Sequence, residues 1–319
     1  MRPHRLPLLA GIVAIAALAA CGGSDSTGSS SSDTMTAGEA DNVGNTVGTL
    51  IDGAAASLTS FSVDDGTLTD PDLSPGAAPR GRSIFLSALR AGARMGRGLN
   101  PPLQADGGVL DNCTPTISDT TDSDHDGIYN DATATFTAGN CTYVNGTGTT
   151  VIATGSIRVQ DKGTIYGFQV NFNTLRYDLT NGSASGSITL TGSYSADVGS
   201  QAASVGQNLH VAVSSNSGNS ATLSEAWSLA FDPTATIPGN ATALPAGSFT
   251  IAGSFNASVN GKSWSLILVS TDPLAYDGSC VDSPIFGSGT IEGQIAAKRS
   301  HGFSIQFNGC GAVPTIAAL

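Results

Sequence analysis

Two periodicities of apolar residues divide the chain after its first forty residues. From about residue 132 to residue 307, apolar and polar residues alternate, which is typical of strands with one buried face. Before this region, apolar residues recur every three or four positions, the spacing of a helix with one apolar face. The helical set is Ala40, Val43, Val47, Leu50, Ile51, Ala54 and Leu58, with Gly44, Gly48 and Gly53 reducing the helix propensity.

The clearest strand pair surrounds Asn260-Gly261, a strong signal for a two-residue hairpin turn. Such a turn fixes the register and places the apolar members of both strands on one face. The expected partners are Val259 with Lys262, Ala257 with Trp264, Phe255 with Leu266, and Gly253 with Leu268.

Similar alternation occurs along most of the second half of the chain, in residues 151–159, 164–175, 188–194, 209–213, 227–231, 285–295 and 303–307. Short turns at residues 161–163, 181–182 and 299–302 predict sequential antiparallel pairing. A sheet with one apolar face must bury it, as a sandwich, a closed barrel or a curved sheet with the early helices in its concavity. We therefore expect a mainly β fold: an antiparallel meander forming a sandwich or strongly curved sheet, preceded by one or two short helices.

A second helix is expected over residues 82–97, after an acidic, proline-containing loop at 63–79. Arg82, Arg90, Arg94 and Arg97 fall on one side of it, opposite an apolar side that includes Phe85. Such a helix either lies on an anionic membrane surface or packs on the β domain with its arginines in solvent or paired with acidic groups.

The amino terminus has the pattern of a secretory signal. Arg2 and Arg5 precede an apolar run over residues 6–18, which is too short to cross a bilayer. Leu18-Ala19-Ala20-Cys21 ends this run and resembles the bacterial lipobox. The resemblance implies cleavage before Cys21, attachment of lipid to its thiol, and a membrane-anchored envelope protein. An ordinary signal with an incidental Cys21 is the alternative.

The residues after Cys21 refine the expected location. Gly22 follows the cysteine where an Asp would favour retention in the inner membrane, so the resemblance implies the outer membrane and leaves the leaflet open. We expect a signal peptide at 1–20, a flexible Gly/Ser tether at 21–38, a helical and loop segment at 39–105, and a β domain at 106–319.

The charge balance excludes one class of partner. The signal holds two of the 13 basic residues and no acidic residue, so the remaining chain has a formal net charge of −14, against −12 for the whole sequence. Nucleic-acid binding is therefore not expected. The 40 glycines and the low aromatic content of 6% instead suit an exported, β-rich protein.

Four cysteines remain once Cys21 is assigned to lipid, and an even number suits disulfides in an oxidising compartment. Three pairings are possible. We expect the local one, Cys113 with Cys141 and Cys280 with Cys310, in which each loop of about 30 residues contributes roughly 3–4 kcal/mol in the chain-entropy model. Zinc is not expected, because no C-x-x-C motif occurs.

One loop, at residues 122–133, carries metal-binding chemistry. Three carboxylates at alternate positions precede Gly127, and such a pattern supplies the oxygen ligands that calcium prefers. The candidate ligands are the side chains of Asp122, Asp124, Asp126, Asn130 and Asp131 and the carbonyl oxygen of Ile128. The loop resembles the calcium repeats of thrombospondin type 3 and the related EF-hand loop.

The loop also departs from the EF-hand pattern. Thr133 stands in place of the bidentate Glu, so Asp131, Asp119 or water would complete the site, with a dissociation constant of roughly 10⁻⁴–10⁻³ M. On this interpretation the calcium is structural. A solvated acidic loop without an ion is the alternative.

No nucleophile elbow, zinc-protease motif, P-loop or dinucleotide fingerprint occurs in the sequence. His210 and His301 are expected to be structural. Glu225 and Glu292 are lone carboxylates on expected strands, and they would act as the acid and base of a glycosidase only if the fold brought them together.

Three functions therefore compete. The residues around 276–280 and Cys310-Gly311 resemble β-rich bacterial lipoproteins of no assigned activity. We expect a non-catalytic binding or structural module of the envelope, with a protein or glycan partner. A carrier with an apolar cavity lined by residues such as Phe168, Phe172 and Trp264 is the first alternative, and an enzyme acting on glycans or peptides is the second.

Overall fold

The computed structural model describes residues 37–59, 115–119, 121, 123, 128–144, 150–162, 165–216, 220–241, 243–259, 262–280, 282 and 284–319. The signal, Cys21, the acidic loop at 63–79 and the helix expected at 82–97 lie outside these residues. The described helix is α2 (Ala37–Thr59).

Strands account for most of the described residues. The first seven are β1 (Thr116–Ser118), β2 (Asp131–Phe136), β3 (Thr142–Val144), β4 (Thr150–Asp161), β5 (Tyr166–Asn181), β6 (Ala184–Val198) and β7 (Ala203–Ser215). They are followed by β8 (Ser220–Pro233), β9 (Gly247–Val259), β10 (Lys262–Tyr276), β11 (Ser288–Ile295), β12 (Lys298–Phe307) and β13 (Thr315–Ala318).

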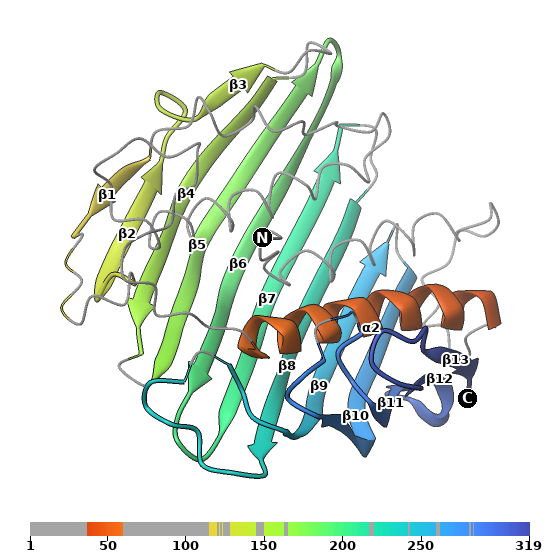
Figure 1. Ribbon diagram of the computed structural model, residues 1–319. Helices are drawn as coiled ribbons and strands as arrows, with labels where there is room; N and C mark the ends of the chain where they lie inside the picture. Colours follow the sequence, from red (N-terminus) through yellow and green to blue (C-terminus); the bar gives the residue numbers. More distant parts are fainter. Residues whose placement is uncertain are drawn as a thin grey trace.

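All of these strands belong to one antiparallel sheet (Figure 1). Its order is β1-β2-β4-β5-β6-β7-β8-β9-β10-β11-β12-β13, and β3 pairs with β4 off this path. Apart from the short β3, each strand therefore lies beside its neighbours in sequence. The expected mainly β meander is confirmed, as a single open sheet with β1 and β13 at its two ends.

Alternate residues of each long strand are buried on one face of the sheet. In β5 the buried residues change phase, from Phe168, Val170 and Phe172 to Leu175, Tyr177 and Leu179. A bulge at Thr174, which has a φ of 55°, makes this change and keeps the apolar side chains on the same face. Gly155 of β4 lies against it with a φ of 112°, where a Cβ would collide with the carbonyl of Thr174.

Helix α2 packs on the buried face, as its apolar spacing predicts. Ala40, Ile51 and Ala54 are among its fully buried residues. The helix contacts β12 and β13 and also β7 and β8, so it joins parts of the sheet that three strands separate (Figure 1).

The glycines of α2 explain how closely it approaches the sheet. A Cβ on Gly44 would lie only 2.7 Å from Cγ2 of Ile316 in β13, whereas one on Gly48 would lie 3.6 Å from Cδ1 of Ile305 in β12. Gly44 therefore lowers the helix propensity, but its lack of a side chain allows the helix backbone to lie close to the sheet.

The strand pairing beside Asn260-Gly261 can be compared with the register expected from that turn. The register at Asn260-Gly261 is confirmed, because Val259 pairs with Lys262 and Ala257 with Trp264. Farther from the turn, a two-residue shift precedes the pairing of Phe249 with Leu274, so the partners expected for Phe255 and Gly253 fall within the irregular stretch.

The turn expected at residues 299–302 is wrong. The chain reverses at residues 296–297, and residues 299–302 belong to β12. Gly302 has a φ of 143° and a Cβ there would collide with the carbonyl of Gly293, so this glycine permits a close contact between strands rather than a turn.

Candidate functional site

A buried polar cluster lies on the apolar face of the two central strands β7 and β8. Gln207 of β7 pairs with Trp227 of β8, and Glu225 is two residues before Trp227 on the same face. The exposed fractions of Gln207, Glu225 and Trp227 are 3%, 1% and 4%. The side-chain amide Nε2 of Gln207 donates a hydrogen bond to Oε1 of Glu225.

Burial controls the ionisation of Glu225. Desolvation raises the pKa of this carboxyl from 4.5 to about 7, because the charged form loses its hydration in the core. The hydrogen bond from Gln207 and the neighbouring indole of Trp227 act in the opposite direction and lower the pKa by less. Glu225 is therefore a group that titrates near neutral pH inside the sheet.

The two lone glutamates do not form a catalytic pair. Glu225 lies on the buried face of β8, whereas Glu292 of β11 alternates with the buried Ile291 and Gly293 and faces outward. Strands β9 and β10 separate them, and Glu292 accepts a hydrogen bond of 2.8 Å from Gln294. The acid and base of a glycosidase must face one cleft, about 5–9.5 Å apart on either side of the scissile bond, and carboxylates on opposite faces of a sheet do not meet this requirement.

His210 lies on the outward face of β7, where its Nδ1 is 2.7 Å from Oγ of Ser224. A triad also needs a third group that orients the histidine. Among the described residues, no carboxylate accepts a hydrogen bond from His210 or forms an ion pair with it. The pair is an ordinary contact between adjacent strands, and His301 is half-buried in β12.

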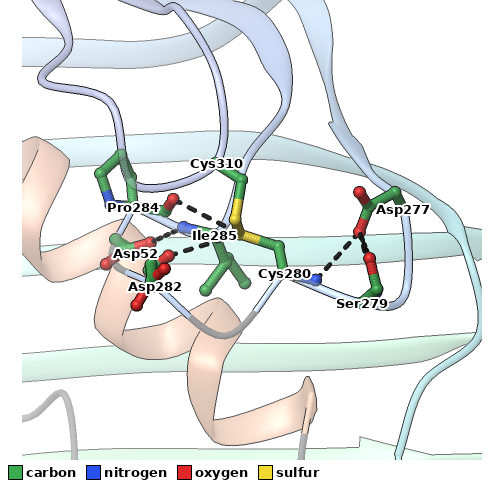
Figure 2. Close-up of a disulfide and its surroundings, with 8 residues drawn as sticks. All are labelled: Asp52, Asp277, Ser279, Cys280, Asp282, Pro284, Ile285 and Cys310. Carbon is green, nitrogen blue, oxygen red and sulfur yellow. Dashed lines mark hydrogen bonds between the residues drawn. A yellow bond between two sulfur atoms is a disulfide. The ribbon is translucent and has the colours of Figure 1, made fainter.

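A disulfide-linked loop fastens the end of the sheet to α2 (Figure 2). Cys280 and Cys310 form a disulfide across 30 residues, with a Cα–Cα distance of 5.8 Å. This pairing confirms half of the expected disulfide pattern. Cys141 is also disulfide-bonded, and its partner lies outside the described residues, as does Cys113.

Carboxylates order the same loop (Figure 2). Asp52 of α2 is 6% exposed, and its Oδ1 accepts a hydrogen bond of 2.7 Å from the backbone N–H of Ile285. Asp277 accepts hydrogen bonds from the backbone N–H groups of Ser279 and Cys280 and from the Ser279 hydroxyl. These bonds lower the pKa of Asp277, and the bond from the Ser279 N–H has the largest effect. The loop therefore docks the early helix onto the late strands.

Part of the expected calcium loop is described. Asp122, Asp124 and Asp126 lie outside the described residues, and the side chain of Ile128 is buried. Asp131 forms an ion pair with Arg158 through two hydrogen bonds of 2.6 and 2.5 Å, which lowers the pKa of Asp131.

The other candidate ligands of this loop also have protein partners. Oδ1 of Asn130 accepts a hydrogen bond from the backbone N–H of Ser123, and Oδ1 of Asp119 accepts one from that of Thr121. In the described part of the chain, no three His, Cys, Asp or Glu residues are grouped to hold a metal. The calcium site remains a prediction that depends chiefly on Asp122, Asp124 and Asp126.

Gln207 and Trp227 were not expected to form a site. Extending the alternation of Leu229 and Trp227 by one step places Glu225 on the buried face, and extending that of Val211 and Leu209 does the same for Gln207. That the two polar residues meet depends on the register of β7 and β8, which the sequence pattern does not reveal.

No known protein family, curated protein or solved structure matches the chain. No helix in the described part of the protein is long and apolar enough to cross a membrane.

Proposed function

We propose that this protein is a lipid-anchored module of the cell envelope that binds a neutral glycan, without catalysis, through the outward face of its sheet. The observation that carries the proposal is the chemistry of that face at its centre. Cross-strand pairing aligns the outward residues of β6 to β9 in rows, each with one residue from every strand. The three rows at the centre of this face consist of Thr191, Ser193, Ser195, Gly206, Asn208, His210, Ser224, Ala226, Ser228, Ala252, Ser254 and Asn256.

These rows offer a regular array of hydrogen-bonding groups. Neighbouring strands of a sheet are spaced by about 4.8 Å, so hydroxyl and amide groups recur at short intervals across four strands. A hydroxyl both donates and accepts hydrogen bonds, and it can therefore meet a sugar hydroxyl in either role. His210 is the one titratable residue in the three rows.

The charges beside these rows support an uncharged partner. The outward arginines of β4 and β5 are paired, Arg158 with Asp131 and Arg176 with Asp178. The chain after Cys21 carries a formal net charge of −14, which disfavours anionic polymers. A neutral polysaccharide would not be repelled by this net charge, and the two described arginines beside the rows are already paired.

The rest of the proposal concerns anchoring and stability. We propose lipid at Cys21, outer-membrane location, and structural calcium bound by Asp122, Asp124 and Asp126 with Ile128 and Asn130. The engagement of Asp131 with Arg158 favours water as the remaining ligand. The disulfide of Cys141 supports the expected bond to Cys113.

The carrier remains the second candidate. Phe168 and Phe172 have exposed fractions of 4% and 2% and belong to the continuous core of the sheet. A carrier would release an apolar molecule on denaturation and extraction, which a glycan-binding module would not.

Affinity electrophoresis tests the proposed function. The processed protein is run through native gels containing neutral or anionic polysaccharides. Retardation by a neutral polysaccharide, with little by anionic ones, is expected. Equal mobility in every gel would contradict glycan binding.

A separate experiment tests the anchor. If Cys21 carries the lipid, the protein from a Cys21→Ser strain should be unprocessed or no longer bound to membranes.

A further inference from the structure

Three buried polar atoms of the cluster on β7 and β8 lack a hydrogen-bond partner among the described residues. They are Oε1 of Gln207, Oε2 of Glu225 and Nε1 of Trp227. Buried polar groups are paired in nearly all cases, and leaving one unpaired costs roughly 1–3 kcal/mol. Three such atoms on adjacent strands point to one shared partner.

The chemistry of the three atoms restricts this partner. The indole N–H of Trp227 can only donate, and the amide oxygen of Gln207 can only accept. A metal cation would face the indole N–H and is excluded. A hydroxyl group accepts from Trp227 and donates to an oxygen, and water, with two protons, can serve both oxygens and reach the usual three hydrogen bonds of a buried water.

We propose that Gln207, Glu225 and Trp227 bind one hydroxyl group in the core of the sheet, supplied by a water molecule or by the terminal alcohol of an apolar ligand. Direct pairing inside the cluster is the alternative, in which the Trp227 N–H donates to Glu225 and a proton on Glu225 is shared with Gln207. A water molecule satisfies all three atoms, and an alcohol does so when Glu225 is protonated and donates to the alcohol oxygen. This site is on the opposite face of the sheet from the proposed glycan surface and does not depend on it.

The neighbouring residues hold the three groups in place. Tyr194 of β6 pairs with Gln207 on the side away from Trp227, and its ring packs on Phe168 with centroids 5.9 Å apart. On the other side, Gly253 of β9 pairs with Trp227, and a Cβ on Gly253 would collide with the Trp227 side chain. The missing side chain thus provides the space in which the tryptophan is seated.

Leu209 and Phe255 flank Glu225 in the next row of paired residues. Both are buried, with exposed fractions of 1% and 6%. Neither side chain can form a hydrogen bond, so the polar cluster is bordered by apolar groups along its own row. An added hydroxyl would therefore bind to the cluster itself.

A crystal structure of the processed protein, at a resolution that shows ordered water, tests the proposal. We expect density within hydrogen-bonding distance of all three atoms. An isolated peak identifies water. Density that continues between apolar side chains, with one equivalent of an alcohol recovered by solvent extraction and mass spectrometry, identifies a ligand. Absence of density at the three atoms, with Oε1 of Gln207 directly against Oε2 of Glu225 or with Nε1 of Trp227 directly against Glu225, would overturn the proposal.

A variant separates a three-point site from chance hydration. Trp227→Phe keeps an aromatic ring but removes the donor, so the hydroxyl density should be lost as the two oxygens share a proton. Glu292→Gln, on the outward face, should keep the density. Unchanged density in Trp227→Phe would also overturn the proposal. If Trp227→Phe does not fold, ¹⁵N-tryptophan NMR of the unmodified protein must show magnetisation transfer from a bound hydroxyl to the Trp227 indole proton.

Discussion

Replacing Glu225 by Gln should abolish a large pH dependence of stability. Burial raises the pKa of Glu225 from 4.5 to about 7 in the folded protein, so the folded state holds its proton more tightly than the unfolded chain does. The stability that depends on this proton is fully present below about pH 4.5 and is lost as the pH rises through about 7. The raised pKa corresponds to about 3 kcal/mol, because one pKa unit is worth about 1.4 kcal/mol.

The assay is thermal or urea unfolding of the processed protein between pH 5 and pH 9, followed by circular dichroism. For a domain of this size, a loss of about 3 kcal/mol corresponds to a fall in Tm of roughly 6–12 °C. Glu225→Gln keeps the shape of the side chain and has no charge to bury, so its stability should stay nearly constant over this range.

A matched control distinguishes this effect from general titration. Glu292→Gln removes a carboxylate from the outward face and should keep the wild-type pH profile. The lowered pKa values of Asp119, Asp131 and Asp277 make stability fall at acidic pH, the opposite direction, and they are common to all variants. Parallel profiles for wild type and Glu225→Gln from pH 5 to pH 9 would refute the reasoning.

Three further predictions concern the helix and the calcium loop. Asp52→Ala should destabilise the protein by about 1–3 kcal/mol in urea unfolding, because the buried N–H of Ile285 loses its acceptor, while Asp52→Asn should retain much of the bond; equal losses would contradict the docking role. Gly48→Ala should stabilise the protein by up to about 1 kcal/mol through helix propensity. Gly44→Ala should destabilise it, because the added Cβ would lie 2.7 Å from Cγ2 of Ile316 in β13. If Gly44→Ala had the higher Tm, α2 would pack differently. Chelation should lower the Tm of the wild type but not of Asp124→Ala, and an equal fall in both would place the ion elsewhere.

Local patterns predicted most of the secondary structure. Alternation located β4 to β12, because a half-buried strand repeats its environment every two residues. The helical spacing of Ala40 to Ala54 located α2. The turn expected at Asn181-Gly182 lies one residue later, at Gly182 and Ser183, because Asn181 pairs with Ala184, and Gly182 has a φ of 59°. The short edge strands β1 and β13 were not predicted, because three or four residues are too few to show a clear alternation of apolar and polar positions.

Contacts between distant residues were beyond these patterns. The hydrogen bond between the N–H of Ile285 and Asp52 joins residues 233 positions apart, and no local pattern near either residue indicates it. Gly44 and Gly302 were interpreted through local propensity, as a helix breaker and a turn residue, whereas packing against Ile316 and the carbonyl of Gly293 explains them. The cluster of Gln207 and Glu225 likewise depends on a strand register that only the assembled sheet defines.

Affinity electrophoresis of two arginine variants tests the proposed glycan face most directly. Ala226 lies at the centre of the outward face, between Asn208 and Ser254, and Ala226→Arg adds bulk and charge there without entering the core. Val313→Arg places the same charge on a residue that is 83% exposed and outside the sheet. We predict that wild type and Val313→Arg bind a neutral polysaccharide equally and that Ala226→Arg binds at least about tenfold more weakly, a difference of about 1.4 kcal/mol. Equal retardation of all three proteins, or of none, would contradict the proposed function.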